Sequence, residues 1–158
     1  MPDHEACRQS DAKPIHHSCD VALLGRIYRD ARIGAETTDT LLTRTSSPAL
    51  AASMIRQMYR YRAFAHTAQQ KLHERGVTAK RISPLMRANI HFGTIAHTLL
   101  DESSSHIAEL MVNGSTMGII DMTKAVQTIP GSQEVRQLGR ELLELEQNNI
   151  EQMKRYLY

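Results

Sequence analysis

Apolar side chains recur every three or four residues along four long segments of the chain, which is the spacing of one face of an α-helix. The segments run from Cys19 to Leu42, from Pro48 to Arg75, from Pro84 to Asn113 and from Ser132 to the C-terminus. Signals typical of strands are nearly absent. Segments of similar length joined by short loops indicate antiparallel neighbours, so we expect an all-α protein, an antiparallel four-helix bundle.

The end of the third segment has two interpretations. Asn113 and Gly114, followed by Ser115, are typical of a helix stop and restart, which predicts an extra short helix after Gly114, over residues 116–129. Alternatively, Gly114 and Gly118 lie within one continuous helix and allow a close contact with its backbone. The sequence leaves open whether residues 114–118 break or continue the helix.

The first 18 residues show no helical period, and we expect a flexible leader over residues 1–18 before a helical bundle domain over residues 19–158. The leader lacks the apolar stretch of a signal peptide. No apolar run in the chain approaches the roughly 20 residues of a membrane span. These features predict a cytoplasmic protein.

Both cysteines, Cys7 and Cys19, lie in or beside this leader, and we expect them to be reduced thiols. With His4, His16 and His17 they form a group of potential metal ligands. Their spacing matches no standard zinc motif, so the leader is interpreted as a polar tail.

The formal net charge is only +2, but it is unevenly distributed along the chain. Residues 21–91 contain twelve Lys and Arg against four Asp and Glu, whereas residues 92–158 contain five against nine. Two halves of opposite charge attract each other within one bundle or between subunits, and we expect a homo-oligomer. A second interpretation is a basic face for an anionic partner, formed by Arg56, Arg60 and Arg62. The chain lacks tryptophan and has two phenylalanines, which argues against a nucleic-acid module that stacks bases on aromatic rings.

Polar side chains interrupt the apolar stripes of the last two long segments. The positions that point inward on a helical projection are Glu102, Glu109, His106 and His91 in the third segment, and Glu146 and Asn149 in the last. A buried carboxylate or imidazole without a partner costs several kcal/mol. We therefore expect these groups to be paired with one another, with water or with a metal ion.

Two functions fit this inward cluster. In the first, Glu102, His106, Glu109 and Glu146 bind a single metal ion, iron or manganese, and His91 and Asn149 support them. In the second, the cluster is purely structural, and the protein is a non-enzymatic oligomeric or adaptor bundle that binds an anionic partner through its basic half. The sequence contains no Gly-rich phosphate loop, no nucleophile elbow and no helical cysteine nucleophile, so it gives no signal for an enzyme.

A four-helix layout with an inward carboxylate–histidine cluster resembles the ferritin-like superfamily. The strings SHIAELMVNGSTMGIID and ELEQNNIEQMKRYL are also similar to those of a small bacterial group of helical-bundle proteins near that superfamily, over residues 20–158. The resemblance implies a four-helix fold and a di-metal site built with two Glu-x-x-His motifs. No Glu-x-x-His motif occurs in residues 19–158, so at most one metal ion is implied here.

Overall fold

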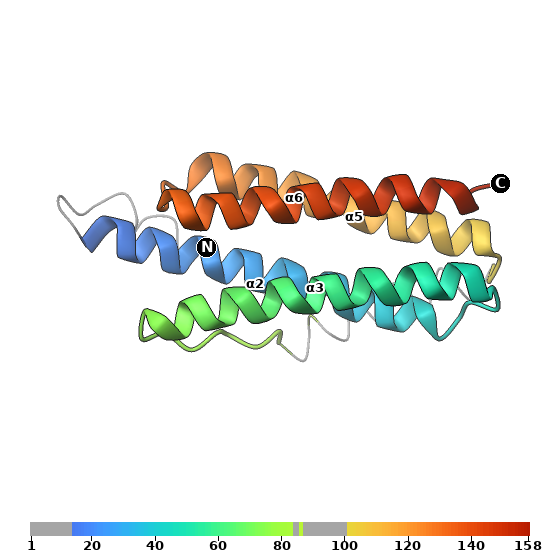
Figure 1. The fold of residues 1–158 in the computed structure, drawn as a ribbon, viewed down its shortest axis with the longest axis horizontal. Coiled ribbons are helices and arrows are strands. Elements are labelled where there is room, and N and C mark those ends of the chain that lie inside the picture. The colour runs from blue at the N-terminus through green and yellow to red at the C-terminus, as the bar shows by residue number, and fades with distance from the viewer. Residues whose placement is uncertain (1–13, 84–85, 87–100) are drawn as a thin grey trace.

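The computed structural model describes residues 14–83, 86 and 101–158. They form the long helices α2 (Pro14–Leu42), α3 (Pro48–Glu74), α5 (Ser104–Thr128) and α6 (Gln133–Met153), and a 3-10 turn, η1 (Lys154–Tyr156). No strand occurs among these residues. In Figure 1, α2 and α3 form one antiparallel pair, and α5 and α6 form a second pair that packs on the first. The prediction of an all-α, antiparallel four-helix bundle is confirmed.

Local capping signals mark the ends of α3 and α6. Ser47 accepts a hydrogen bond from the backbone N–H of Leu50, and Ser132 accepts one from that of Val135. These bonds satisfy N–H groups that have no partner inside the helix. Gly76 follows α3 with a φ of +74°, a left-handed conformation that glycine adopts readily. The predicted starts of the second and the last helix are therefore confirmed.

The third predicted helix begins later than the sequence suggested. Ser103 is the N-cap of α5 and accepts a hydrogen bond from the backbone N–H of His106. Asp101 in turn accepts a 2.7 Å hydrogen bond from the backbone N–H of Ser103. The chain is therefore non-helical just before α5, and the earlier helical period does not carry over into it. His91 and most of the predicted third helix lie outside the described residues.

α5 continues without interruption through residues 114–118 to Thr128. The extra short helix predicted after Gly114 is therefore wrong, and the continuous alternative is correct. A glycine inside a helix costs roughly 1 kcal/mol relative to alanine, an amount that the packing of α5 against α2 and α6 offsets. Gly118 makes the close contact that this alternative requires, because it lies against the side chain of Glu146.

The N-terminal part of the bundle differs from expectation in two ways. α2 begins at Pro14, so residues 14–18 of the predicted leader are helical. Cys19 is buried and disulfide-bonded, which corrects the expectation of a reduced thiol. Cysteine spacing alone does not show whether two Cα atoms approach within the roughly 7 Å that a disulfide needs. In the described part of the chain, no helix has both the length and the apolar character needed to cross a bilayer.

Two apolar clusters form the core. The larger draws on all four long helices, and its fully buried members include Leu23, Leu24 and Ile27 of α2, Leu72 of α3, Met122 of α5 and Leu142 of α6. The smaller lies where α2 ends and α5 begins, and it contains Leu41, Leu50, Met54, Ile107, Ala108, Met111 and Met153.

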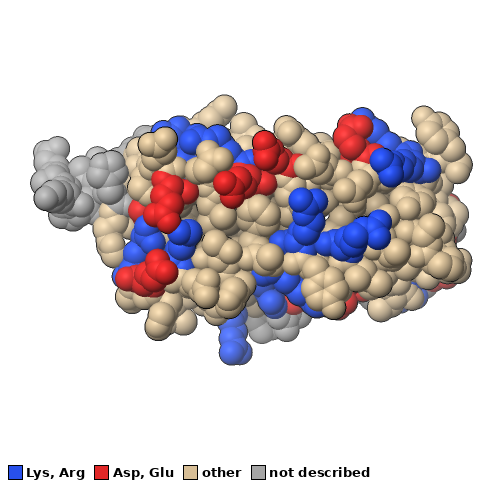
Figure 2. All heavy atoms as spheres, viewed as in Figure 1, with Lys and Arg blue, Asp and Glu red and all other residues tan. Residues whose placement is uncertain are grey.

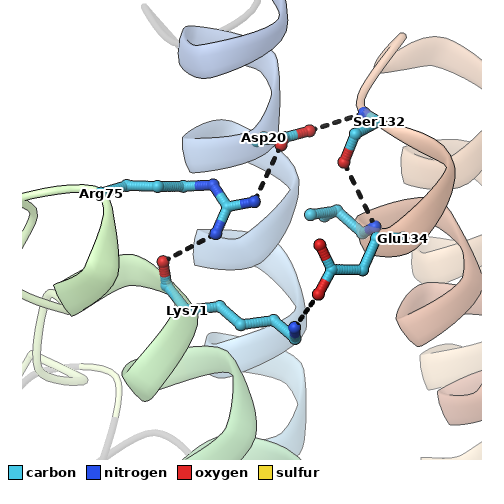
Figure 3. A network of polar contacts seen from close by, with 6 residues as sticks. Asp20, Lys71, Arg75, Ser132 and Glu134 are labelled. Atoms are coloured by element: carbon cyan, nitrogen blue, oxygen red, sulfur yellow. Dashed lines mark hydrogen bonds and ion pairs between the residues drawn. The ribbon is translucent and has the colours of Figure 1, made fainter.

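A polar network joins three helices at one end of the bundle (Figure 3). The carboxylate of Asp20, on α2, accepts a 3.1 Å hydrogen bond from Arg75 and a 2.6 Å hydrogen bond from the backbone N–H of Ser132. Lys71 of α3 forms an ion pair with Glu134 of α6 beside it. Asp20 is buried, whereas Glu134 is exposed. This network fixes the end of α3 and the start of α6 relative to α2.

Replacing Asp20 by asparagine is expected to lower the free energy of unfolding by about 2 kcal/mol, because hydrogen bonds to a buried charged group contribute roughly 1.5–3 kcal/mol. Glu134→Gln is the matched control in the same network. An exposed ion pair contributes at most about 1 kcal/mol, so this variant should change stability little. Urea unfolding of both variants at pH 7 makes the comparison. Equal decreases in the free energy of unfolding of the two variants would show that the burial of Asp20 does not strengthen its contribution to stability.

Candidate functional site

The predicted metal ligands near the start of α5 point outward. The Glu102 side chain is 57% exposed, and its Oε1 lies 3.5 Å from Nη1 of Arg44. The Glu109 side chain is 62% exposed, and its Oε2 lies 3.5 Å from Nδ1 of His106. Glu102 and Glu109 are therefore surface residues, contrary to the prediction that they face the core.

The break before α5 explains this error. The prediction extended a helical period from the residues before position 100 through His106. The observed helix starts afresh at Ser104, and its buried face includes Ala108, Met111 and Ser115. At roughly 100° per residue, His106 lies about 160° around the helix from Ala108. Its imidazole is thus half-buried at a helix end and does not lie on the apolar stripe.

Glu146, the fourth predicted ligand, is buried in α6 as expected. It lies beside Gly118 of α5, which follows His106 by twelve residues, or about 18 Å along the helix axis. The four residues therefore do not converge. Among the described residues, no group of three or more His, Cys, Asp or Glu is placed to hold a metal ion. The hypothesis of an iron or manganese site has no support in this part of the chain.

The structure gives Glu146 a partner that the sequence did not reveal. The hydroxyl of Tyr61, on α3, donates a 2.5 Å hydrogen bond to Oε2 of Glu146. The same hydroxyl lies 3.4 Å from Oγ of Ser115, on α5. Three helices therefore contribute to one buried polar group. Glu146 and Asn149 were predicted to point inward, and both positions are confirmed. Tyr61 is buried as well.

Burial changes the protonation of this pair. It raises the pKa of Glu146 from 4.5 to about 7, although the hydrogen bonds from Tyr61 and Ser115 act in the opposite direction. Burial, with the nearby charge of Glu146, raises the pKa of Tyr61 well above its usual value of 10. At neutral pH the tyrosine is therefore a hydrogen-bond donor, and the carboxyl group is divided between its protonated and ionised forms.

Two glycines make room for the pair. A Cβ atom on Gly34 of α2 would lie 2.6 Å from Cε1 of Tyr61, so the phenol ring packs directly on the α2 backbone. A Cβ atom on Gly118 would lie 2.7 Å from Oε1 of Glu146. These contacts explain glycines within two helices, where that residue is otherwise unfavourable. Of these two glycines, the sequence pattern had indicated a close backbone contact only for Gly118.

The Tyr61–Glu146 pair lies at the base of a cleft between α2 and α5, called here the α2–α5 cleft. Its volume is about 180 Å³. Its polar lining consists of Asp30, Asp121, Glu146, Tyr61, Ser115, Thr37 and Thr38, and the remaining lining consists of Ile33, Met111, Met117, Gly34, Gly114 and Gly118. Acidic and hydroxyl groups thus share a small cleft with apolar side chains.

Asp30 is the second buried acid of this cleft. Its side chain is 9% exposed, and Oδ1 lies 3.7 Å from Nε of Arg29. Burial raises its pKa, and Asp121 contributes in the same direction, whereas Arg26 and Arg29 oppose the change. Its Oδ2 has no hydrogen-bond partner among the described residues. A buried carboxylate oxygen without a donor is uncommon in folded proteins.

The basic face proposed from the sequence lies elsewhere, on the outer side of α3. Arg56, Arg60 and Arg62 are all exposed, and the guanidinium of Arg62 lies 5.9 Å from the ring centroid of Tyr59. Figure 2 shows Lys and Arg side chains gathered over the middle of the face that α3 and α6 form. Their exposure agrees with the sequence analysis. Binding of an anionic partner and homo-oligomer formation remain predictions.

Scans against protein-family models, curated proteins and solved structures found no match to this chain. The resemblance to the ferritin-like superfamily, and to the bacterial helical-bundle group near it, is therefore unsupported beyond the shared four-helix architecture.

Proposed function

We propose that the protein is a ligand-binding helical bundle that holds a small organic molecule in the α2–α5 cleft. The observation that carries this proposal is the placement of Glu146. It is a buried carboxyl group that lines a cleft, receives a hydrogen bond from Tyr61 at Oε2, and has a pKa raised to about 7. A titratable group with a perturbed pKa in a cleft is typical of functional sites.

A purely structural role explains Glu146 less well. Its raised pKa means that the ionised form is less favourable in the folded protein than in the unfolded chain. A methionine or leucine of similar volume would pack at this position without that penalty. An unfavourable buried acid at the wall of a cleft is expected where the acid contacts a ligand.

The size and lining of the cleft limit the ligand. A cavity of about 150 Å³ is known to hold benzene, so a cleft of about 180 Å³ accommodates roughly six to eight non-hydrogen atoms. Small-molecule sites combine apolar walls with a few polar groups that fix the orientation. Ile33, Met111 and Met117 supply the apolar walls here, and the carboxyl and hydroxyl groups supply the polar contacts.

A variant that fills the cleft tests the proposal. Gly114 lines the cleft, and no heavy atom lies within 4 Å of a Cβ placed on it. Gly114→Leu is therefore expected to abolish binding without unfolding the protein, since leucine also favours the helix over glycine by roughly 0.8 kcal/mol. Binding is measured by NMR titration of ¹⁵N-labelled protein with three probes of equal length: n-butylammonium, butan-1-ol and butyrate. We expect the best probe to bind with a Kd of about 1 mM.

Asn113→Leu is the matched control, because Asn113 is the exposed neighbour of Gly114 and does not line the cleft. It should bind the probes as the wild type does. The proposal is wrong if no probe shifts the resonances of residues that line the cleft. It is also wrong if the Gly114→Leu variant binds the probes as tightly as the Asn113→Leu variant does.

A further inference from the structure

We infer that the ligand of the α2–α5 cleft is a small organic cation, an ammonium group with a short apolar chain, held between Glu146 and Asp30. This inference rests on the proposed function and adds the chemical class of the ligand. Three features of the cleft support it: the sign of its charge, the oxygen of Asp30 that has no donor, and the apolar character of its walls.

The charged residues that line the cleft are all acidic. They are Asp30 of α2, Asp121 of α5 and Glu146 of α6, and no Lys, Arg or His is among the described lining residues. Asp121 raises the pKa of Asp30, and Asp30 raises that of Glu146, so the carboxylates repel one another. Arg26 and Arg29 offset part of this repulsion from one side of Asp30. A cation inside the cleft would relieve the remainder, whereas a carboxylate or phosphate would increase it.

One buried carboxylate oxygen of the cleft lacks a donor among the described residues. Tyr61 donates to Oε2 of Glu146, Ser115 also donates to this carboxyl group, and Oε1 packs against Gly118. Oδ2 of Asp30 is buried and has no hydrogen-bond partner among the described residues. An ammonium group carries three N–H donors and no acceptor, so it satisfies acceptors of this kind from a single position.

The walls favour an organic cation over a metal ion. Hard divalent cations need six or more oxygen ligands around one point, and the described acids do not form a group that could hold a metal ion. Ile33, Met111 and Met117 instead present apolar surface beside the acids. Methionine side chains adapt readily to the shape of an alkyl chain. The site therefore fits a molecule with one charged end and one apolar end.

The three butyl probes separate charge from shape. At pH 8 the alkylammonium is protonated, as a lysine side chain is. We expect n-butylammonium to bind at least about tenfold more tightly than butan-1-ol, the ratio that about 1.4 kcal/mol of charge recognition produces, and butyrate not to bind. Asp30→Asn and Glu146→Gln should each reduce this preference about tenfold. Glu141→Gln, which removes an exposed acid of α6 outside the cleft, should leave it unchanged.

The outcomes distinguish this inference from the proposed function. If butan-1-ol or butyrate binds in the cleft as tightly as n-butylammonium, the cation inference is wrong and the ligand-binding proposal stands. If none of the three probes binds, both are wrong. If Glu141→Gln and Glu146→Gln reduce the preference for n-butylammonium equally, this preference reflects the net charge of the protein alone. That result would also overturn the inference. The use of two cleft variants keeps the test valid if one of them is unstable.

Discussion

Between pH 4.5 and pH 7.5, the free energy of unfolding of the wild type is expected to fall by about 3 kcal/mol more than that of Glu146→Gln. The pKa of Glu146 is 4.5 in its ordinary state and about 7 in the folded protein. Between these values the folded protein keeps a proton that the unfolded chain has lost, so stability decreases as the pH rises. A difference of about 2.5 units at 1.36 kcal/mol per unit gives this magnitude.

Urea unfolding of both proteins at four pH values across this range measures the difference. The comparison with glutamine is needed because other acids contribute to the pH dependence of both proteins. The pKa of Asp30 is also raised, whereas the pKa values of Asp101 and Glu134 are lowered by hydrogen bonds. Parallel curves for the two proteins would show that Glu146 ionises in the folded state as freely as in the unfolded chain.

Gly34→Ala is expected to destabilise the protein by about 3 kcal/mol relative to Gly25→Ala, although both variants make the same substitution within α2. The new Cβ at position 34 would lie 2.6 Å from the ring of Tyr61, which is buried and bonded to Glu146. Overpacking of this kind typically costs 1–3 kcal/mol. A Cβ on Gly25 meets nothing within 4 Å, so this variant should gain up to roughly 1 kcal/mol of helix propensity.

Thermal and urea unfolding of the two alanine variants provide the measurement. The Gly34→Ala variant should also show shifted NMR resonances for Ser115 and Glu146, because displacement of the Tyr61 ring moves its hydroxyl. Equal stabilities would mean that the ring of Tyr61 does not pack against the α2 backbone. In that case the geometry at the base of the α2–α5 cleft would need revision.

Both predictions concern one group of side chains, and they are linked to the proposed ligand. The hydroxyl of Tyr61 donates to one oxygen of Glu146, and the other oxygen packs against Gly118. A cation beside Glu146 would lower the pKa of that carboxyl group, because it favours the ionised form. Bound n-butylammonium should therefore reduce the difference in pH dependence between the wild type and Glu146→Gln.

The sequence by itself determined the features that depend on neighbours in the chain. The spans of α3 and α6 follow from apolar residues at helical spacing and from capping by Ser47 and Ser132. The same spacing placed Glu146 and Asn149 on buried faces. These predictions succeeded because hydrogen bonds between residues close in sequence fix the course of a helix. The position of a residue along the helix then determines the direction in which its side chain points.

At the start of α5, the helical register predicted from the apolar pattern was wrong. Ser103 caps α5 three residues before His106, whereas the apolar period had predicted one helix that continues through this position. The cap determines the register of the following helix, and Glu102 and Glu109 therefore face solvent. The four predicted ligands therefore do not converge in the described part of the chain, since those of the third segment were assigned from a helical period that does not match the register of α5.

Only the tertiary structure decided which buried groups meet. Tyr61 and Glu146 are 85 residues apart, and Asp20 and Ser132 are 112 residues apart. Their contacts depend on which helix faces which, and on how far each is shifted along its neighbour. The spacing of apolar residues predicts which face of each helix is buried, but it does not predict how far one helix is shifted along its neighbour. A displacement of one turn, about 5.4 Å, would separate Tyr61 from Glu146 and remove the cleft, so the packing of the four helices creates the site.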